Sequence, residues 1–297
     1  MLAHAVSNFW WVSELIFEAR PNRPRHAGLH AVLAVGDVEL VEQVVAGDEH
    51  AGTAVIGREA SADVMIRAAL DARSERGPAL FVTSANGQVI SECARSPALR
   101  ELFLSADLIH ADGMPLVFAS RIKGRHRLPE RVATTDLFHD VARLAQKTGA
   151  SFYLLGASAP VIERAVARVG AMYPGLKIAG YRDGYWTPDE TDSVIAEINA
   201  SAPDILWIGM GVPHEIAFSV QNRSKLTNVG LIKTSGGLFD FLSGKSSRAP
   251  SWMQSSGLEW LYRLSLEPRR LLRRYASTNL HAAYLLLSAS PNTIGEQ

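Results

Sequence analysis

Polar side chains that could do acid–base chemistry follow two apolar runs of the sequence. Ser84 and Asn86 follow the run at 79–83, and Asp112 follows the run at 107–111. Short apolar runs of this kind are typical of buried parallel strands, and open parallel sheets bind ligands at the carboxyl ends of their strands. A partly desolvated carboxylate there can take a proton from a hydroxyl group, so Asp112 is a candidate general base.

Each of these three residues also has an ordinary structural interpretation. Asp112 could cap a helix that begins at Met114, and the residues alone give the two interpretations equal weight. Ser84 and Asn86 could cap the helix that follows them, which is the commoner role for such residues. Otherwise their hydroxyl and amide groups would hydrogen-bond a polar ligand at the same edge of the sheet.

Glycines follow the later apolar runs, at positions where the backbone could approach a phosphate closely. These glycines are Gly156, Gly209, Gly211, Gly236 and Gly237. A tight turn is the commoner role for each. The pair at 209 and 211 lacks the third glycine of the dinucleotide-binding fingerprint, and no acidic residue ends the following strand at the required distance. The pattern therefore disfavours a nicotinamide-dependent oxidoreductase.

The histidines and carboxylates show no metal-binding spacing. His110, His126, His139 and His214 are scattered, and the sequence contains neither H-E-x-x-H nor D-x-D. The sequence therefore predicts chemistry that needs no metal and no cofactor.

A basic amphipathic segment lies near the C-terminus. Pro268 suits the first turn of a helix, on which four arginines fall within an arc of about 140° opposite leucines and a tyrosine. The arginines are Arg269, Arg270, Arg273 and Arg274, and Arg263 precedes them. Such a pattern is usually a solvated face, but no acidic residue between 269 and 275 compensates the charge. Uncompensated guanidinium groups suit phosphates, so this helix could meet a diphosphate, an anionic bilayer surface or both.

Length and composition limit the class of protein. The 297 residues carry 30 basic and 30 acidic side chains, which argues against a nucleic-acid partner. The single Cys93 excludes an intrachain disulfide and suits a reducing compartment. The sequence has no run of about 18 uncharged apolar residues and no basic leading segment before an apolar stretch. If this protein meets a membrane, we therefore expect it to lie on the membrane surface and not to span the bilayer.

The apolar runs alternate with segments of helical period from about Thr53 onward. This alternation predicts βαβ units and a Rossmann-like parallel α/β sheet flanked by helices. The expected strands are 53–57, 79–83, 107–111, 151–156, 176–180, 204–209 and 229–234, and the last expected helices are 251–264, 267–277 and 281–287. We predict an N-terminal extension of unclear structure (1–52), an α/β core (53–245) and a helical C-terminal appendage (246–297).

Several of these segments together resemble a known family. The strings TSAN, LIHADGMPLV, RVATTDLF, LLGAS, YPGLKIAG, PDILWIGMGVPHE, GGLFDFLSGKSSRAP and GLEWLYRLSLEPRRLLRRY occur in the order seen in WecG/TagA/CpsF glycosyltransferases. The resemblance covers about residues 53–275. The form IKTSGGLFDFLSG, followed by RAPSWMQ, is most similar to the GumM-like branch of xanthan-type glucosyltransferases.

The resemblance implies an inverting transfer of a sugar from a UDP-sugar to a polyprenyl-diphosphate-linked saccharide, in surface polysaccharide synthesis at the cytoplasmic membrane face. It implies that Asp112 is the catalytic base and that Ser84 and Asn86 stand for a Thr-x-Asn motif. The glycine turns and Asp136 would bind the nucleotide sugar, and the C-terminal arginines would close over the lipid diphosphate. The usual P-K-Q-E is here Pro213-His214-Glu215-Ile216, which leaves any donor contact of the missing lysine and glutamine unsupported.

The sequence leaves alternatives open. The branch resemblance favours UDP-glucose, with UDP-N-acetylmannosamine or its uronic acid as the alternative donor. A non-enzymatic nucleotide-binding protein that docks on membranes would share the same features, and turnover of a UDP-sugar would separate the two classes. Assembly into a homo-oligomer is also left open.

Overall fold

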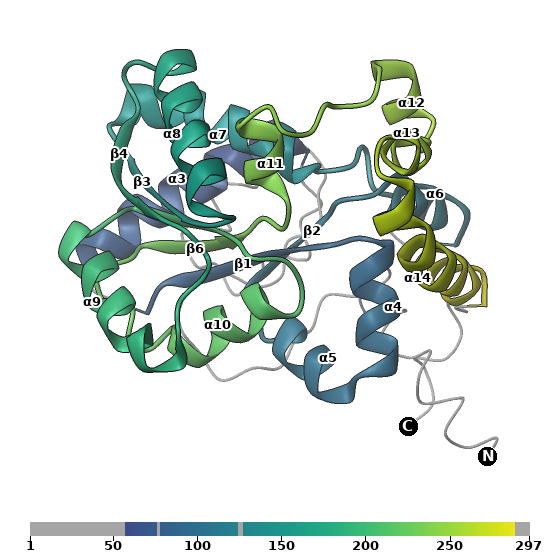
Figure 1. Cartoon of the computed structure of the whole chain (residues 1–297), viewed down its shortest axis with the longest axis horizontal. Coiled ribbons are helices and arrows are strands. Elements are labelled where there is room, and N and C mark those ends of the chain that lie inside the picture. Colours follow the sequence, from purple (N-terminus) through teal and green to yellow (C-terminus); the bar gives the residue numbers. More distant parts are fainter. Residues whose placement is uncertain (1–56, 76–77, 124–126, 289–297) are drawn as a thin grey trace.

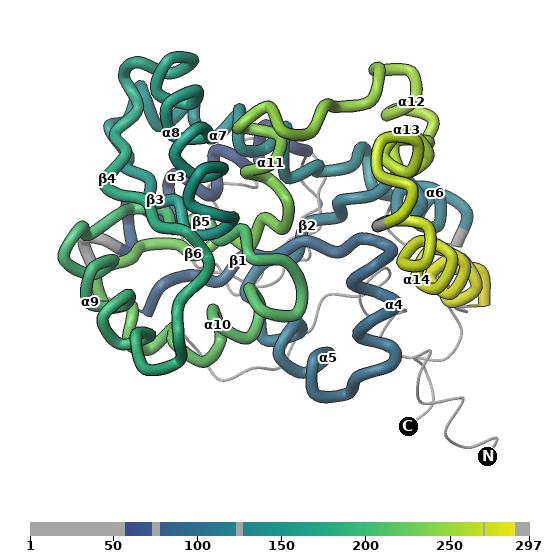
Figure 2. The backbone as a smooth tube through the Cα atoms, in the orientation of Figure 1, coloured from purple at the N-terminus to yellow at the C-terminus, as the bar shows by residue number. Residues whose placement is uncertain are grey.

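The computed structural model describes residues 57–75, 78–123 and 127–288 (Figures 1 and 2). Its centre is a six-stranded sheet in the order β2-β1-β6-β5-β3-β4, in which every pairing is parallel. The strands are β1 (Leu80–Ala85), β2 (Leu108–Ala111), β3 (Ser151–Gly156), β4 (Lys177–Arg182), β5 (Ile205–Gly209) and β6 (Leu231–Thr234). The predicted Rossmann-like α/β fold is confirmed. The expected strand at 53–57 lies almost wholly outside the described residues.

Helices lie on both faces of the sheet (Figure 1). Ahead of the C-terminal region they are α3 (Arg58–Glu75), α4 (Gly87–Arg95), α5 (Pro97–Leu104), α6 (Met114–Lys123), α7 (Thr134–Thr148), α8 (Ala159–Met172), α9 (Thr191–Ser201), α10 (His214–Asn222) and α11 (Leu238–Leu242), with a 3-10 turn η1 (Pro188–Glu190). All five residues of β5 are buried, because helices cover the central strands on two sides. Edge strand β4 instead alternates exposed and partly buried residues.

Aromatic side chains fill the core between α7 and the sheet. The ring of Trp207 lies 5.0 Å from that of Phe138 and 5.8 Å from that of Phe152, in tilted and edge-on arrangements. All three are fully buried. Such large contacts hold α7 firmly on the sheet, and the first residue of α7 thereby has a fixed place at the sheet edge.

The chain reverses its direction of winding between β3 and β5. From β3 the chain crosses to β4 through α8, and from β5 it crosses the other way to β6 through α10. Gly156 and Gly209 end these neighbouring strands side by side. A Cβ on Gly156 would lie 2.2 Å from the carbonyl oxygen of Gly209, so only glycine fits there. Such a reversal is where open α/β sheets bind ligands.

The C-terminal region forms α12 (Ser251–Ser255), α13 (Glu259–Leu266) and α14 (Pro268–Ser288). Helix α14 is one helix of 21 residues, whereas the sequence predicted two. It lies beside α4 (Figures 1 and 2), where Leu271 and Leu285 are buried. The Ser91 hydroxyl and His281 Nδ1 are 2.9 Å apart across this contact. The helix is therefore seated on the core, and the proposed division at 245/246 stays a prediction.

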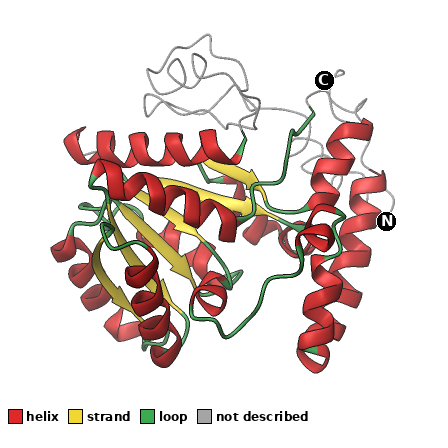
Figure 3. Cartoon of the chain, turned by 90° about the horizontal axis from the view of Figure 1, so that it is seen from above, coloured by secondary structure: helices red, strands yellow, loops and turns green. Residues whose placement is uncertain are grey.

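The strands run toward this C-terminal region. In Figure 1, β1 runs toward the side where α4 and α14 lie, and Figure 3 shows the same direction from above. A Cβ on Gly257, in the turn before α13, would lie 3.1 Å from the Cβ of Met114 at the start of α6. The carboxyl ends of β1 and β2 are thus next to the C-terminal helices. In the part of the chain that the structure describes, no helix has the length and apolar character needed to cross a bilayer.

Candidate functional site

The carboxylate of Asp112 is held at one oxygen and open at the other. Its Oδ2 accepts hydrogen bonds from the backbone N–H of Thr134 at 3.1 Å and from the Thr134 hydroxyl at 2.9 Å. Thr134 begins α7, so Asp112 caps α7 and does not cap α6 as the structural interpretation expected. Within the described residues no hydrogen bond reaches Oδ1, and the residue is partly exposed. This oxygen is free to accept a proton.

Ser84 and Asn86 lie beside Asp112 and have different roles. The backbone N–H of Asp112 donates to the carbonyl of Ala85, which joins the two strand ends at 2.8 Å. Asn86 Oδ1 accepts from the backbone N–H of Val89 at 3.1 Å, so Asn86 is the N-cap of α4. Ser84 caps nothing. Its hydroxyl contacts Thr134 Oγ1 at 3.2 Å.

Lys233 is the polar residue of this site that sequence reasoning missed. It lies on central strand β6, is fully buried, and donates from Nζ to the Ser84 hydroxyl and to the Thr234 carbonyl, both at 2.8 Å. Burial lowers its pKa to about 8, against the opposing charges of Asp112 and Glu215. The sequence could have pointed to Lys233, because a lysine inside the apolar run VGLIKT is unusual for a buried strand.

His110 lies next to Ser84 in the strand register and is also buried. Neither of its ring nitrogens has a hydrogen-bond partner in the structure. Burial lowers the pKa of His110 well below its usual value, and the charge of Lys233 lowers it further. The imidazole is therefore neutral near pH 7.

A buried glutamate occupies the glycine turns. Glu215 Oε2 accepts from the backbone N–H groups of Met210 at 3.2 Å, Gly211 at 3.0 Å and Gly236 at 2.9 Å. Burial raises the pKa of Glu215 to about 7, although these amides favour its charged form. The backbone amides of Gly211 and Gly236 therefore serve a carboxylate of the protein itself, and the role of these glycines in nucleotide-sugar binding stays a prediction.

The remaining glycines have no such partner. Gly156 and Gly209 lie at the reversal between β3 and β5, where their close approach leaves the strand ends bare of side chains. Gly237 is exposed and precedes α11. Their predicted role in nucleotide-sugar binding stays a prediction.

Asp136 is committed to an ion pair. Its two oxygens accept from Arg248 Nη1 at 2.9 Å and Nη2 at 3.2 Å. Arg248 also donates to Glu259 at 2.9 Å, and Arg131 donates to the same carboxylate at 2.8 Å. These contacts join α7 to α13. The structure thus gives Asp136 a structural contact that sequence alone could not show, because its partner lies 112 residues away, and its predicted role in nucleotide-sugar binding stays a prediction.

Four of the C-terminal arginines form no ion pair with an acidic side chain among the described residues. Arg269 and Arg273 are exposed, whereas Arg263 and Arg274 each place the guanidinium 5.2 Å from an aromatic ring centre, those of Phe241 and Tyr275. No ion pair is found for these four within the described residues. The side chain of Arg270 lies outside them.

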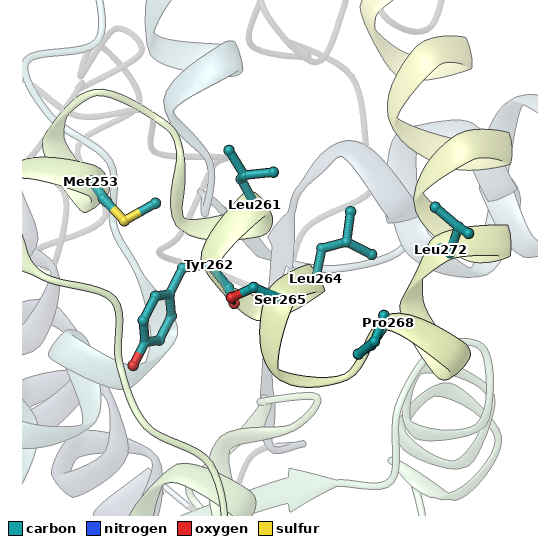
Figure 4. Close-up of a pocket in the computed structure, with 7 residues that line it drawn as sticks. All are labelled: Met253, Leu261, Tyr262, Leu264, Ser265, Pro268 and Leu272. Carbon is teal, nitrogen blue, oxygen red and sulfur yellow. The ribbon is translucent and has the colours of Figure 1, made fainter.

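An apolar groove of about 440 Å³ lies between α13 and α14, beside the arginines (Figure 4). Leu261 and Leu264 line it from α13 and Leu272 lines it from α14. Trp252 is also 63 % exposed nearby in sequence. Exposed apolar side chains thus accompany exposed cations on this part of the surface. Across 57–75, 78–123 and 127–288, no group of three or more histidine, cysteine or acidic residues is placed to hold a metal ion.

Comparison with known proteins relates this site to sugar transfer. The model of the glycosyl transferase WecG/TagA/CpsF family matches residues 57–294. Two relatives carry the name N-acetylglucosaminyldiphosphoundecaprenol N-acetyl-beta-D-mannosaminyltransferase. The relative from Bacillus subtilis strain 168 is 35% identical over 207 residues, 67% of this chain and 78% of the relative. The relative from Bacillus spizizenii is 34% identical over 222 residues, 73% of this chain and 84% of the relative.

Proposed function

Because the chain belongs to the WecG/TagA/CpsF family of glycosyltransferases, we propose that it transfers N-acetylmannosamine from its UDP derivative to a sugar on polyprenyl diphosphate. The class of enzyme is settled by the family: the chain is a hexosyltransferase. The proposed acceptor is N-acetylglucosaminyl-diphosphoundecaprenol, which the names of both relatives contain. The product would feed the synthesis of a cell-surface polymer.

The donor proposed here differs from the one that the branch resemblance favoured. Both relatives are named as N-acetylmannosaminyltransferases and neither as a glucosyltransferase. UDP-N-acetylmannosamine, the alternative in the sequence analysis, therefore replaces UDP-glucose as the preferred donor. The GumM-like assignment has no support from these relatives.

The free oxygen of Asp112 is the observation that carries the proposed mechanism. Oδ1 would take the proton of the acceptor hydroxyl, whose oxygen attacks the anomeric carbon of the donor. The bond between that carbon and the diphosphate oxygen breaks, and its electron pair leaves with UDP. Attack from the face opposite the leaving group inverts the anomeric configuration. Thr134 holds the other oxygen of Asp112, so the base cannot turn away.

Cationic side chains would meet the phosphates. The amides of Gly211 and Gly236 serve Glu215, so unpaired guanidinium groups are the better candidates. Arg269 and Arg273 are exposed and have no acidic partner within the described residues. They lie on the helix that borders the apolar groove, where a lipid-linked diphosphate and a membrane surface could both be contacted.

A panel of donors tests the proposal. The purified chain is incubated with N-acetylglucosaminyl-diphosphoprenol and one of four donors: UDP-N-acetylmannosamine, its uronic acid, UDP-N-acetylglucosamine or UDP-glucose. Mass spectrometry reports the product, and the one-bond carbon–proton coupling constant at the new anomeric carbon reports its configuration, because the H1–H2 coupling of a mannosaminide is small in both anomers. We expect transfer from UDP-N-acetylmannosamine with inversion, and the same rate in EDTA.

Each other outcome contradicts a specific part of the proposal. Preferred transfer of glucose would support UDP-glucose, the donor that the branch resemblance favoured. Loss of activity in EDTA that magnesium restores contradicts the metal-independent mechanism. UDP binding with no turnover of any donor favours the non-enzymatic nucleotide-binding alternative and contradicts the proposed reaction.

A further inference from the structure

The ammonium group of Lys233 is buried, and among the described residues no carboxylate contacts it. Lys233 pairs with Val82 on one side and Trp207 on the other, in the middle of the sheet. Its two partners are neutral oxygens, those of the Ser84 hydroxyl and the Thr234 carbonyl. A charge in such surroundings is costly to desolvate, and an uncharged side chain of the same length would fill the position more cheaply. The lysine therefore calls for a role beyond packing.

A chain of hydrogen bonds leads from this ammonium to the proposed base. Lys233 Nζ is 2.8 Å from the Ser84 oxygen, that oxygen is 3.2 Å from Thr134 Oγ1, and Thr134 Oγ1 is 2.9 Å from Asp112 Oδ2. An ammonium group can only donate and a carboxylate can only accept. Each hydroxyl between them must then accept on the lysine side and donate on the aspartate side. The two charged ends fix the direction of every proton in the chain.

We propose that Lys233 is a positioning residue for glycosyl transfer, which holds Asp112 through Ser84 and Thr134 so that Oδ1 faces the acceptor hydroxyl. This inference rests on the proposed role of Asp112 as base. Ser84 acquires a definite task in it as the link between lysine and Thr134. The same arrangement places a fixed positive charge behind a carboxylate that must be ionised before the reaction.

The titratable groups around Lys233 favour its charged form near pH 7. Three titratable groups face it: Asp112 from the loop between β2 and α6, Glu215 from α10, and His110 from β2. The buried His110 is neutral near pH 7, and the two carboxylates favour the charged lysine. The pKa of Lys233 lies at about 8, so the amine loses its charge above that pH and the chain loses its fixed direction.

The test uses two breaks in the chain and one matched control. Lys233→Met removes the ammonium, Ser84→Ala removes the middle link, and a double variant combines them. Thr83→Val is the control. Thr83 and Thr234 share a buried hydrogen bond of 2.7 Å on the same two strands, but their side chains point to the opposite face from Lys233. The Thr83→Val change therefore removes an equally buried hydrogen bond that is not part of the chain connecting Lys233 to Asp112.

We expect Lys233→Met to lower kcat by about 10²-fold, as for a misplaced catalytic group, while the Kd for UDP and the KM for the donor stay near their wild-type values. The double variant should lose no more than the worse single variant, because both changes break one chain. The wild-type kcat should fall above pH 8, and this alkaline fall should be absent in Lys233→Met. Thr83→Val should keep near wild-type kcat and pH dependence.

Three results would overturn the inference: an unchanged kcat in Lys233→Met, losses that multiply in the double variant, or an equal loss in Thr83→Val. The wild-type arm separates these from a failure of the proposed function. If the wild-type chain transfers sugar and Lys233→Met does so equally well, only the role of Lys233 is wrong. If the wild-type chain transfers sugar from no donor, the proposed function fails, and the inference fails with it.

Discussion

At the scale of single residues, the two oxygens of the Asp112 carboxylate lie in different surroundings. Oδ2 is fixed by the backbone and hydroxyl of Thr134, and Oδ1 has no protein partner in the described part of the chain. An N-cap and a general base are thus not competing interpretations for this residue, because one oxygen can serve each purpose. The helix end that it caps is that of α7, whose Thr134 lies 22 residues after Asp112 in the chain, and not the helix that begins at Met114.

Replacing Asp112 by asparagine separates these two purposes. The amide oxygen can still accept from Thr134, and the NH2 group then occupies the position of Oδ1, where it cannot take a proton. We expect kcat to fall about 10²–10⁴-fold, with UDP affinity and thermal stability nearly unchanged. Isothermal titration with UDP and a transfer assay measure the two effects. Asp192→Asn, at an exposed carboxylate paired with Lys225, is the control. Near wild-type turnover in Asp112→Asn would leave Asp112 as a cap only.

The second prediction at this scale concerns Glu215 and the way the free energy of unfolding depends on pH. Its folded-state pKa of about 7 lies above the ordinary value of 4.5, because burial disfavours the charge. Between these two values the folded state holds the proton more tightly, so the free energy of unfolding should fall as pH rises from about 5 to about 7. Glu215→Gln, which keeps an amide-accepting oxygen, should lack this contribution. Urea titrations of both proteins across this range measure it. If the free energy of unfolding changed with pH in the same way in both proteins, Glu215 would not titrate between pH 5 and pH 7.

The partners of these residues explain what the sequence could and could not predict. Asp112 and Asn86 were found because each directly follows a strand, and Ser84 because it lies near the carboxyl end of one, where the ends of parallel strands meet. Thr134 and Lys233 were missed because their roles come from contacts made 22 and 149 residues away. The ion pair of Asp136 was missed for the same reason, since nothing near it in sequence reveals Arg248.

At the scale of elements, prediction worked best where burial decides the structure. Six of the seven expected strands are found among the described residues, and the continuous apolar runs of the central strands fit a sheet that helices cover on both faces. The predicted break between 277 and 281 was wrong. Ser277 and Thr278 direct their hydroxyls back to the Arg274 carbonyl, at 3.0 Å and 2.8 Å, and the helix continues. Its contact with α4 stabilises a helix that local sequence alone left interrupted.

Arg248 is the main polar link between the core and helices α12 and α13. It donates to Asp136 on α7 and to Glu259 on α13 from a largely buried position. Arg248→Met would leave both carboxylates without this donor, at a cost of about 1.5–3 kcal/mol for each lost charged contact. We expect faster hydrogen exchange in 251–266 and unchanged exchange in β3 and β5. Lys245→Met breaks an exposed pair with Asp240 and is the control. Equal protection of 251–266 in Arg248→Met and wild type would refute this link.

At the scale of the whole molecule, the numbers of basic and acidic side chains are equal, but the charges are unevenly distributed over the surface. The chain has 30 basic and 30 acidic side chains, yet no ion pair neutralises Arg263, Arg269, Arg273 or Arg274 within the described residues. The helices that carry them lie on the side toward which β1 runs (Figures 1 and 3). Exposed leucines and Trp252 belong to the same region. The proposed catalytic edge of the sheet and the surface that we propose for membrane contact are therefore on one side of the molecule.

This unevenness predicts that the place of the charge, rather than its amount, sets membrane binding. Arg269 and Arg273 are four residues apart and exposed on α14, and Arg164 and Arg168 have the same spacing and exposure on α8, on the opposite side in Figure 1. Replacing either pair by glutamine changes the net charge equally. Each arginine near an anionic surface contributes about 1 kcal/mol, so the α14 pair should cost about 30-fold in affinity for vesicles with anionic lipid. Replacing the α8 pair should leave this affinity unchanged.

Vesicle flotation at low and high salt measures the affinity of both double variants, since salt screening weakens only the electrostatic part of binding. UDP titration checks that the core is intact, and equal flotation of the two double variants would mean that α14 presents only a solvated face.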